Sequence, residues 1–218
     1  DIMLVNRNGQ LGTFFKVNGE EYAVSAPGAF SVYNAVAAIT VCRHYGIDQE
    51  IIRKALKTIR VPGRVEVIDN DRGYLLLIDY AHNAMSLKNI LETMRRYHPR
   101  QLWVLFGCGG GRSSARRREM GRVAGKYADF TVITSDNPRY EEPERIMQTI
   151  EEGMKETKGQ YQMMVDRKEA MRFMLTQGRP GDILILAGKG HEQYQEIKGD
   201  YLPFNERKIA QEILAYLD

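Results

Sequence analysis

The sequence has few cysteines and no long apolar run. Only two of its 218 residues are cysteine, Cys42 and Cys108, and they form no CxxC pair. This usage argues against a disulfide scaffold or a zinc site, and we predict no metal ligands in the chain. No stretch approaches eighteen consecutive apolar residues, and no signal-peptide pattern opens the sequence. We therefore expect a cytoplasmic protein without a membrane partner.

The chain also lacks an excess of charge of one sign. It contains 31 Lys and Arg residues against 28 Asp and Glu residues, a formal net charge of +3. Nucleic-acid-binding proteins usually concentrate more positive charge on one face, so we expect no nucleic-acid partner. A composition of 43% apolar and 27% charged residues is typical of a folded globular protein, and the slight positive charge suits small anionic substrates.

Residues 1–62 combine a strand pattern with two helical patterns. Apolar and polar residues alternate over residues 1–5, 11–17 and 21–24. Asn8-Gly9 and Asn18-Gly19 lie between these segments and predict hairpin turns. The sequence begins inside a strand pattern without an initiator methionine, so we expect a piece of a longer protein.

Two helices are expected after these strands. Ser31 is the predicted N-cap of a helix that ends at Gly46, and Asp48 is the predicted N-cap of a second helix. Val61-Pro62-Gly63-Arg64 interrupts the helical pattern and predicts a linker. We therefore expect one domain over residues 1–62 and another over residues 63–218.

The second domain alternates strand and helix patterns. Continuous apolar runs predict buried strands at residues 75–78, 102–106, 130–133 and 183–186. Amphipathic helices are predicted at residues 86–97, 114–127, 143–154, 166–176 and 205–217. The alternation indicates an α/β fold, a doubly wound, mostly parallel, Rossmann-like sheet, preceded by a smaller α+β part.

In such a sheet, ligands bind beyond the carboxyl ends of the strands. The four runs that follow the predicted strands are Asp79-Tyr80-Ala81-His82-Asn83, Gly107-Cys108-Gly109-Gly110-Gly111-Arg112-Ser113-Ser114, Ser135-Asp136-Asn137-Pro138-Arg139 and Gly188-Lys189-Gly190-His191-Glu192. Three of them also have a structural interpretation: Asp79 caps a turn, Gly188 and Gly190 are turn residues, and Arg139 is a surface side chain. Their coincidence at four strand ends is what predicts a ligand site.

The glycine-rich runs match neither standard nucleotide fingerprint. Arg112 stands where the third glycine of a dinucleotide motif belongs, and Gly188-Lys189-Gly190 lacks the glycine spacing and the Ser or Thr of a phosphate loop. The free N–H groups before a helix still favour an anion, and Arg112 can bind a carboxylate with two hydrogen bonds. The run Arg116-Arg117-Arg118 is interpreted as a solvated helix face.

Taken in order, these stretches resemble the Mur ligases, and among them the type that adds the third amino acid of the peptidoglycan stem peptide. The other matching pieces are Tyr33-Asn34-Ala35, Val61-Pro62-Gly63-Arg64 and Tyr194-Gln195. The resemblance covers the chain from about residue 30 to its end. It implies an ATP- and Mg²⁺-dependent, monomeric ligase of three domains, with this chain holding the tail of the central ATPase domain and the whole amino-acid-binding domain.

The resemblance also implies roles for individual residues. The nucleotide would be contacted by Asn34, Arg64, His82 and Asn83. The amino acid would be contacted by Arg112, Asp136, Asn137, Arg139, Gly188 and Glu192. The family's phosphate loop, magnesium ligands and carbamylated lysine do not occur in these residues, so we expect no catalytic residue here and no activity from this chain alone.

The family's Asp-Asn-Pro-Arg motif implies meso-diaminopimelate as the amino acid. This compound differs from lysine by a carboxylate beside its distal ammonium group. Arg139 would pair with that carboxylate and repel the bare ammonium of lysine. The whole enzyme would then add meso-diaminopimelate to UDP-N-acetylmuramoyl-L-alanyl-D-glutamate in the synthesis of the cell wall.

Some residues depart from the family pattern. Ala84 replaces a proline, Gly111 and Ser113 replace acidic neighbours of Arg112, and Asn205-Glu206 replaces a more acidic pair. The alternatives are a sister ligase of the lysine-adding or folylpolyglutamate synthase type and a non-catalytic module that binds an amino acid or a nucleotide. A nicotinamide-dependent oxidoreductase is disfavoured because the glycine fingerprint is incomplete.

Overall fold

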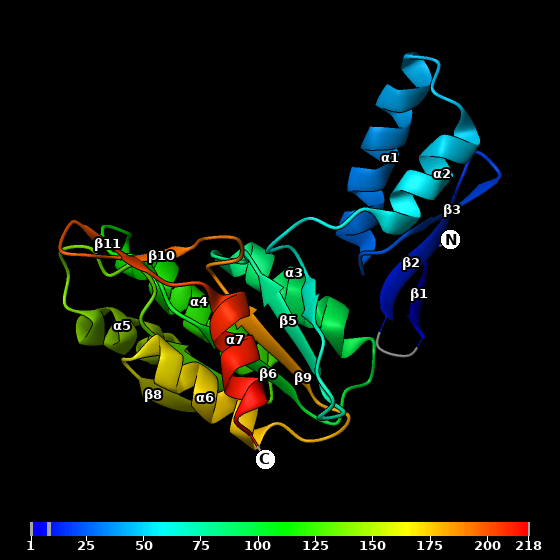
Figure 1. Ribbon diagram of the computed structural model, residues 1–218. Helices are drawn as coiled ribbons and strands as arrows, with labels where there is room; N and C mark the ends of the chain where they lie inside the picture. The colour runs from blue at the N-terminus through cyan, green and yellow to red at the C-terminus, as the bar shows by residue number, and fades with distance from the viewer. Residues whose placement is uncertain (1, 8–9, 218) are drawn as a thin grey trace. The chain divides into compact units, whose positions relative to one another are not determined.

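A computed structural model of the chain describes residues 2–7 and 10–217, with side chains from Leu11 onward. The chain divides into two compact units, residues 1–61 and residues 62–218 (Figure 1). Each is described by itself below. No helix in the part of the chain that the structure describes is both long and apolar enough to cross a membrane.

The first unit packs a three-stranded sheet against two helices. Its elements are β1 (Ile2–Arg7), β2 (Gln10–Val17), β3 (Glu20–Val24), α1 (Ala29–His44) and α2 (Gln49–Thr58). The strands are antiparallel in the order β1-β2-β3. Phe15, Tyr22, Ile39 and Ile52 are buried between the sheet and the helices. The predicted strands and helices of this unit are therefore present.

The turns and caps of this unit differ from the prediction at one position. Asn18 and Gly19 have φ angles of 50° and 82°, as a tight hairpin turn requires, and Asp48 accepts hydrogen bonds from the N–H groups of Glu50 and Ile51. The prediction that Ser31 is an N-cap was wrong, because α1 begins after Gly28 and the Ser31 hydroxyl donates to the Pro27 carbonyl. The predicted turn at Asn8-Gly9 lies outside the described residues.

The second unit is a six-stranded sheet with helices on both faces. The strand order is β4-β5-β9-β6-β7-β8, parallel throughout except that β4 pairs antiparallel with β5. The strands are β4 (Glu66–Ile68), β5 (Leu75–Asp79), β6 (Leu102–Phe106), β7 (Phe130–Thr134), β8 (Gln160–Met164) and β9 (Ile183–Ala187). Every residue of β6 and β9 is buried, which confirms the predicted doubly wound sheet.

Five helices cover this sheet. They are α3 (Ala84–Arg95), α4 (Ser114–Tyr127), α5 (Pro143–Lys155), α6 (Arg167–Gln177) and α7 (Glu206–Ala215). Helices α6 and α7 pack on one face, and α3, α4 and α5 form a row on the other (Figure 1). Asn83 is the N-cap of α3, so this helix begins two residues before the predicted start at Ser86.

Four strands of the second unit were not predicted. Strands β4 and β8 form the two edges of the sheet, and β10 (Tyr194–Ile197) pairs with β11 (Asp200–Pro203) in a hairpin that follows β9. An isolated bridge between Arg139 and Ile197 joins this hairpin to the loop after β7. The hairpin therefore lies at the end of the sheet where a ligand site is expected.

Candidate functional site

A pocket opens at the carboxyl ends of β5, β6, β7 and β9 in the second unit. Its lining consists of Tyr80, His82, Gly107, Cys108, Gly109, Arg112, Arg116, Arg117, Asp136, Asn137, Arg139, Gly188 and Glu192. The structure thus brings together the side chains of Arg112, Asp136, Asn137, Arg139 and Glu192, with Gly188 beside them. Each comes from a loop that follows a strand, because parallel strands end at the same edge of a sheet.

The glycine-rich loop after β6 lies directly against the loop after β7. A Cβ atom on Gly107 would stand 2.3 Å from the Thr134 carbonyl oxygen, and one on Gly110 would stand 2.0 Å from the Pro138 carbonyl oxygen. The Gly110 N–H donates to the Asn137 carbonyl at 2.8 Å. Glycine is required at these positions because two backbones meet there.

An ion pair with Glu141 also holds the glycine-rich loop after β6. Arg117 donates two hydrogen bonds to the Glu141 carboxylate, each 2.8 Å long, and Glu141 also accepts from the Gly111 N–H. The bond from Arg117 contributes most to the low pKa of Glu141, which falls to about 2. The interpretation of Arg117 as a solvated side chain was wrong, because it is 5% exposed, whereas Arg118 is exposed as predicted. Arg112 is exposed at the rim of the pocket.

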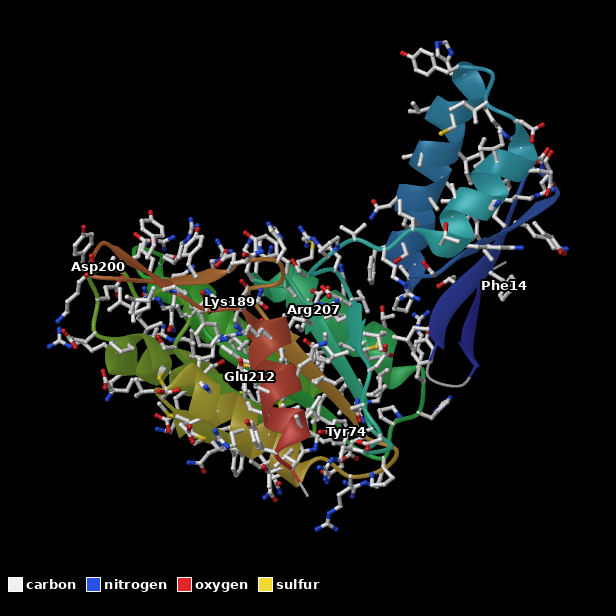
Figure 2. The ribbon with its side chains drawn as sticks, viewed as in Figure 1. Phe14, Tyr74, Lys189, Asp200, Arg207 and Glu212 are labelled. Carbon is white, nitrogen blue, oxygen red and sulfur yellow. The ribbon has the colours of Figure 1, made fainter. Side chains whose placement is uncertain are left out.

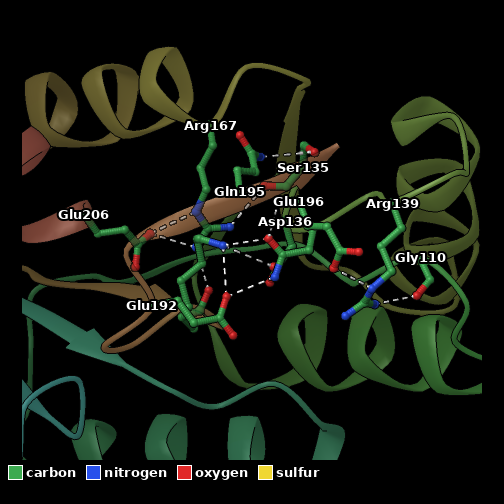
Figure 3. A network of polar contacts seen from close by, with 12 residues as sticks. Gly110, Ser135, Asp136, Arg139, Arg167, Glu192, Gln195, Glu196 and Glu206 are labelled. Carbon is green, nitrogen blue, oxygen red and sulfur yellow. Dashed lines mark hydrogen bonds and ion pairs between the residues drawn. The ribbon is translucent and has the colours of Figure 1, made fainter. Parts of the chain in front are cut away.

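Arg139 is fixed at the pocket by both its backbone and its side chain. It has a left-handed φ of 56°, and its N–H and carbonyl bond to the β10–β11 hairpin at Glu196 and Lys198. Its Nε donates to Glu196 Oε2 at 2.9 Å and its Nη1 donates to the Gly110 carbonyl at 2.7 Å (Figure 3). Among the described residues, Nη2 has no hydrogen-bond partner, so this end of the guanidinium group is available to a ligand.

Glu192 also lines the pocket and belongs to a network that the sequence did not reveal. Glu192 Oε2 accepts from Asn137 Nδ2 at 2.9 Å and from Lys189 Nζ at 3.1 Å. Lys189 is completely buried, and its Nζ also donates to Asn137 Oδ1 at 3.0 Å. A Cβ on Gly188 would stand 2.9 Å from Asp136 Oδ2, so glycine makes room for this carboxylate. Lys189 was not among the predicted site residues.

A fully buried ion pair lies behind these loops. Arg167 donates to Glu206 Oε1 at 2.9 Å, to the Ser135 carbonyl at 3.2 Å and to the Ala187 carbonyl at 2.8 Å. Ser135 and Ala187 stand at the ends of β7 and β9, which β6 separates in the sheet. Arg167 therefore fixes two strand ends that precede site loops. No periodicity in the sequence marks this residue.

Two of the residues predicted to contact a nucleotide, Arg64 and His82, lie around the Tyr80 ring in the second unit. His82 and His191 lie against the Tyr80 ring with ring centroids 4.6 Å and 5.2 Å away, and the Arg64 guanidinium lies 4.8 Å from the same ring. Arg64 and His82 are exposed. They form with Tyr80 a cationic and aromatic surface. Asn34 is an exposed residue of α1 in the other unit.

Asn83 and Asp79 have structural roles next to this surface. Asn83 Oδ1 caps α3 by accepting from the Ser86 N–H, which leaves only its Nδ2 for a ligand. Asp79 accepts from the N–H groups of Val65 and Ala81, and burial raises its pKa. No group of three or more His, Cys, Asp or Glu side chains within residues 11–217 is arranged to hold a metal ion.

Comparison with known proteins identifies the family. A family model described as "Mur ligase, glutamate ligase domain" matches residues 63–190. The UDP-N-acetylmuramoyl-L-alanyl-D-glutamate–2,6-diaminopimelate ligase of Caldanaerobacter subterraneus subsp. tengcongensis is 46% identical over 213 residues, which are 96% of this chain and 44% of that protein. The ligase of the same name from Alkaliphilus oremlandii is 43% identical over 197 residues, 90% of this chain and 40% of that protein.

A solved structure agrees with these relatives. The structure of a UDP-N-acetylmuramoyl-L-alanyl-D-glutamate–2,6-diaminopimelate ligase superposes with a TM-score of 0.72 at 34% identity, covering 98% of this chain and 45% of that one. The chain thus spans less than half the length of the relatives it matches. Because the family model covers more than half of its residues, the chain belongs to the Mur ligase family.

Proposed function

We propose that this chain supplies the amino-acid-binding part of an ATP-dependent ligase that adds meso-diaminopimelate to UDP-N-acetylmuramoyl-L-alanyl-D-glutamate. In this proposal, residues 1–62 are the tail of the central ATP-binding domain and residues 63–218 are the amino-acid-binding domain. The names of the relatives support the substrate, and the pocket at the carboxyl ends of the strands supports the assignment.

The position of Arg139 carries the proposal. Arg139 lines the pocket, and its Nη2 has no hydrogen-bond partner among the described residues, while its other nitrogens are held by Glu196 and Gly110. Glu192, on the neighbouring loop, has one carboxylate oxygen, Oε1, outside the network that binds Oε2. A fixed cation and a fixed carboxylate in one pocket match the carboxylate and ammonium groups at the far end of meso-diaminopimelate.

The chemistry proposed for the whole enzyme needs more than this chain. ATP would phosphorylate the terminal carboxylate of the UDP-linked dipeptide, and the amino group of meso-diaminopimelate would displace phosphate from the acyl phosphate to form the amide bond. We place the Mg²⁺ ligands elsewhere in the enzyme, as the resemblance to the family implies. The part of this chain is to bind and orient the incoming amino acid.

Calorimetric titration of the chain with meso-diaminopimelate and with L-lysine tests the proposal. We expect binding of meso-diaminopimelate and much weaker binding of lysine. Arg139→Ala should weaken the binding of meso-diaminopimelate by about 10- to 100-fold, as the loss of a charge-assisted hydrogen bond predicts. Arg145→Ala, at an exposed position of α5, is the matched control. Equal binding of both amino acids would contradict the proposal, and so would an Arg139→Ala variant that binds like the wild type.

A further inference from the structure

The ammonium group of Lys189 occupies an acidic position beneath the pocket. Its Nζ lies 3.0 Å from Asn137 Oδ1, 3.1 Å from Glu192 Oε2 and 3.7 Å from Asp136 Oδ1. The side chain is completely buried, lies inside the second unit (Figure 2) and is not part of the pocket lining, whereas its three partners all line the pocket. The chain therefore inserts a cation of its own behind the residues that face the ligand.

Lys189 also fixes the orientation of its partners. Asn137 Oδ1 accepts from Lys189 and from the Glu196 N–H, so Asn137 Nδ2 is directed to Glu192 Oε2. Glu192 Oε2 is used by these two donors, and within residues 11–217 Oε1 has no hydrogen-bond partner. A ligand ammonium thus meets one oxygen of a carboxylate whose other oxygen is already bound (Figure 3).

The net charge of Asp136, Glu192 and Lys189 affects which amino acid binds more tightly. Asp136 and Glu192 contribute two negative charges and Lys189 one positive charge, which leaves a single net negative charge. Without Lys189 the position would carry two uncompensated carboxylates in a partly buried site, where charges interact strongly. Such a site favours a bare ammonium over a group that carries an ammonium and a carboxylate side by side, because the second carboxylate is repelled.

We propose that Lys189 is a specificity-determining residue, whose buried ammonium group fills the acidic position formed by Asp136, Asn137 and Glu192 and so prevents the bare side-chain ammonium of lysine from competing with meso-diaminopimelate. This inference rests on the proposed function and adds to it a discrimination that Arg139 alone does not supply. Arg139 attracts the distal carboxylate, whereas Lys189 reduces the attraction for a lone cation.

A chemical-rescue experiment tests the ammonium site without reference to the enzyme's substrate. Lys189→Ala removes three methylene groups and the ammonium group, which together correspond to n-propylammonium. We expect n-propylammonium to raise the Tm of Lys189→Ala saturably and to leave the wild type unchanged. The double variant Lys189→Ala with Glu192→Gln should lose most of the rescue, and n-propanol should not replace n-propylammonium. If Lys189→Ala is unfolded by itself, folding induced by n-propylammonium is the readout.

A second experiment tests specificity directly. Lys189→Met keeps an unbranched side chain that is one heavy atom shorter and removes the charge, and calorimetry compares its affinities for meso-diaminopimelate and L-lysine. We expect the ratio of the two affinities to fall by about tenfold or more, which is the size of one charged hydrogen bond. Lys168→Met, at an exposed position of α6, is the control and should keep the wild-type ratio.

The outcomes separate this inference from the proposed function. If the wild type prefers meso-diaminopimelate and Lys189→Met keeps the same ratio, the specificity role is overturned and the proposed function stands. If n-propylammonium stabilises Lys189→Ala no more than the wild type, the ammonium site is overturned. If the wild type binds neither amino acid, the proposed function of this chain fails and the specificity role fails with it, while the rescue experiment still decides the ammonium site.

Discussion

The Arg167 guanidinium and the Glu206 carboxylate form an ion pair in which both side chains are completely buried, with Nη2 and Oε1 2.8 Å apart. Arg167 belongs to α6 and Glu206 to the first turn of α7, so the pair joins the two helices that cover one face of the sheet. Through the Ser135 and Ala187 carbonyls it also holds the ends of β7 and β9. The packing of two helices and the spacing of two site loops therefore depend on one side chain.

Arg167→Met should destabilise the chain by about 3–5 kcal/mol, because it leaves a buried carboxylate without its counter-charge. Two backbone carbonyls lose their donor in the same step. Denaturant unfolding monitored by circular dichroism measures the change. The control is Arg118→Met, whose ion pair with Glu152 is about half exposed on both sides and should contribute about 0–1 kcal/mol. Equal effects of the two variants would show that the buried pair has no special role.

The Arg117–Glu141 pair should make stability depend on pH in acid. The pKa of Glu141 is about 2 in the folded chain against a usual value of 4.5, so between these values the unfolded chain binds more protons than the folded one. The contribution of Glu141 is therefore complete above pH 4.5 and is lost as the pH falls toward about 2. We expect the difference in unfolding free energy between the wild type and Glu141→Gln to shrink over this range.

Unfolding measured at a series of pH values tests this expectation. Glu144→Gln, an exposed change in the first turn of α5, is the control and should follow the wild-type pH profile. A gap between the wild type and Glu141→Gln that stays constant from pH 4.5 to 2 would contradict the assigned role of the Glu141 carboxylate.

The contact between the loops after β6 and β7 should tolerate no added side-chain atom at Gly110. The Cβ of Gly110→Ala would stand 2.0 Å from the Pro138 carbonyl oxygen, so the backbone must shift. We expect a loss of about 1–3 kcal/mol in stability, typical of overpacking, together with weaker binding of meso-diaminopimelate because Gly110 holds Arg139. Gly46→Ala is the control: Gly46 has a φ of +71° and open space around it. This variant should lose only about 1–2 kcal/mol of stability, from the left-handed backbone, and should bind meso-diaminopimelate like the wild type.

The parts of the fold that follow from local pattern were predictable from the sequence. The run Leu102–Phe106 is apolar throughout and forms a strand buried on both faces. Strand β8 (Gln160–Met164) was missed because it lies at an edge of the sheet, is half exposed and contains two glutamines. The hairpin β10–β11 was missed for the same reason, since each strand has four residues and little burial.

The ionic interactions of the site were not predictable in the same way. Lys189 stands between two glycines and pairs with residues more than fifty positions away in the chain, Asp136 and Asn137, as well as with nearby Glu192. Arg117 and Arg118 are neighbours in one basic run, yet the first is buried against Glu141 and the second is exposed. Only the packing of α4 against the loop after β7 distinguishes them. Periodicity predicts which face of a helix is buried but does not name distant charged partners.

Glu196 affects Arg139 in two opposing ways, which its variants can separate. Its Oε2 accepts from Arg139 Nε and so orients the guanidinium group, whereas its negative charge reduces the attraction of Arg139 for a ligand carboxylate. Glu196→Gln keeps an acceptor and removes the charge, so it should bind meso-diaminopimelate at least as tightly as the wild type. Glu196→Ala removes both and should bind about tenfold more weakly than Glu196→Gln, because an oriented donor is lost.

Calorimetric titration of the two variants and the wild type with meso-diaminopimelate checks this order. Glu152→Ala changes an exposed residue of α5 and serves as the control. If Glu196→Ala binds as tightly as Glu196→Gln and neither binds more weakly than the wild type, orientation of Arg139 by Glu196 has no part in recognition and the charge of Arg139 is sufficient. If both variants bind more weakly than the wild type by the same factor, the carboxylate itself is needed. Only the expected order, with Gln tighter than Ala, makes Glu196 a positioning residue for Arg139, because glutamine keeps an oxygen that accepts from Arg139 Nε and alanine does not.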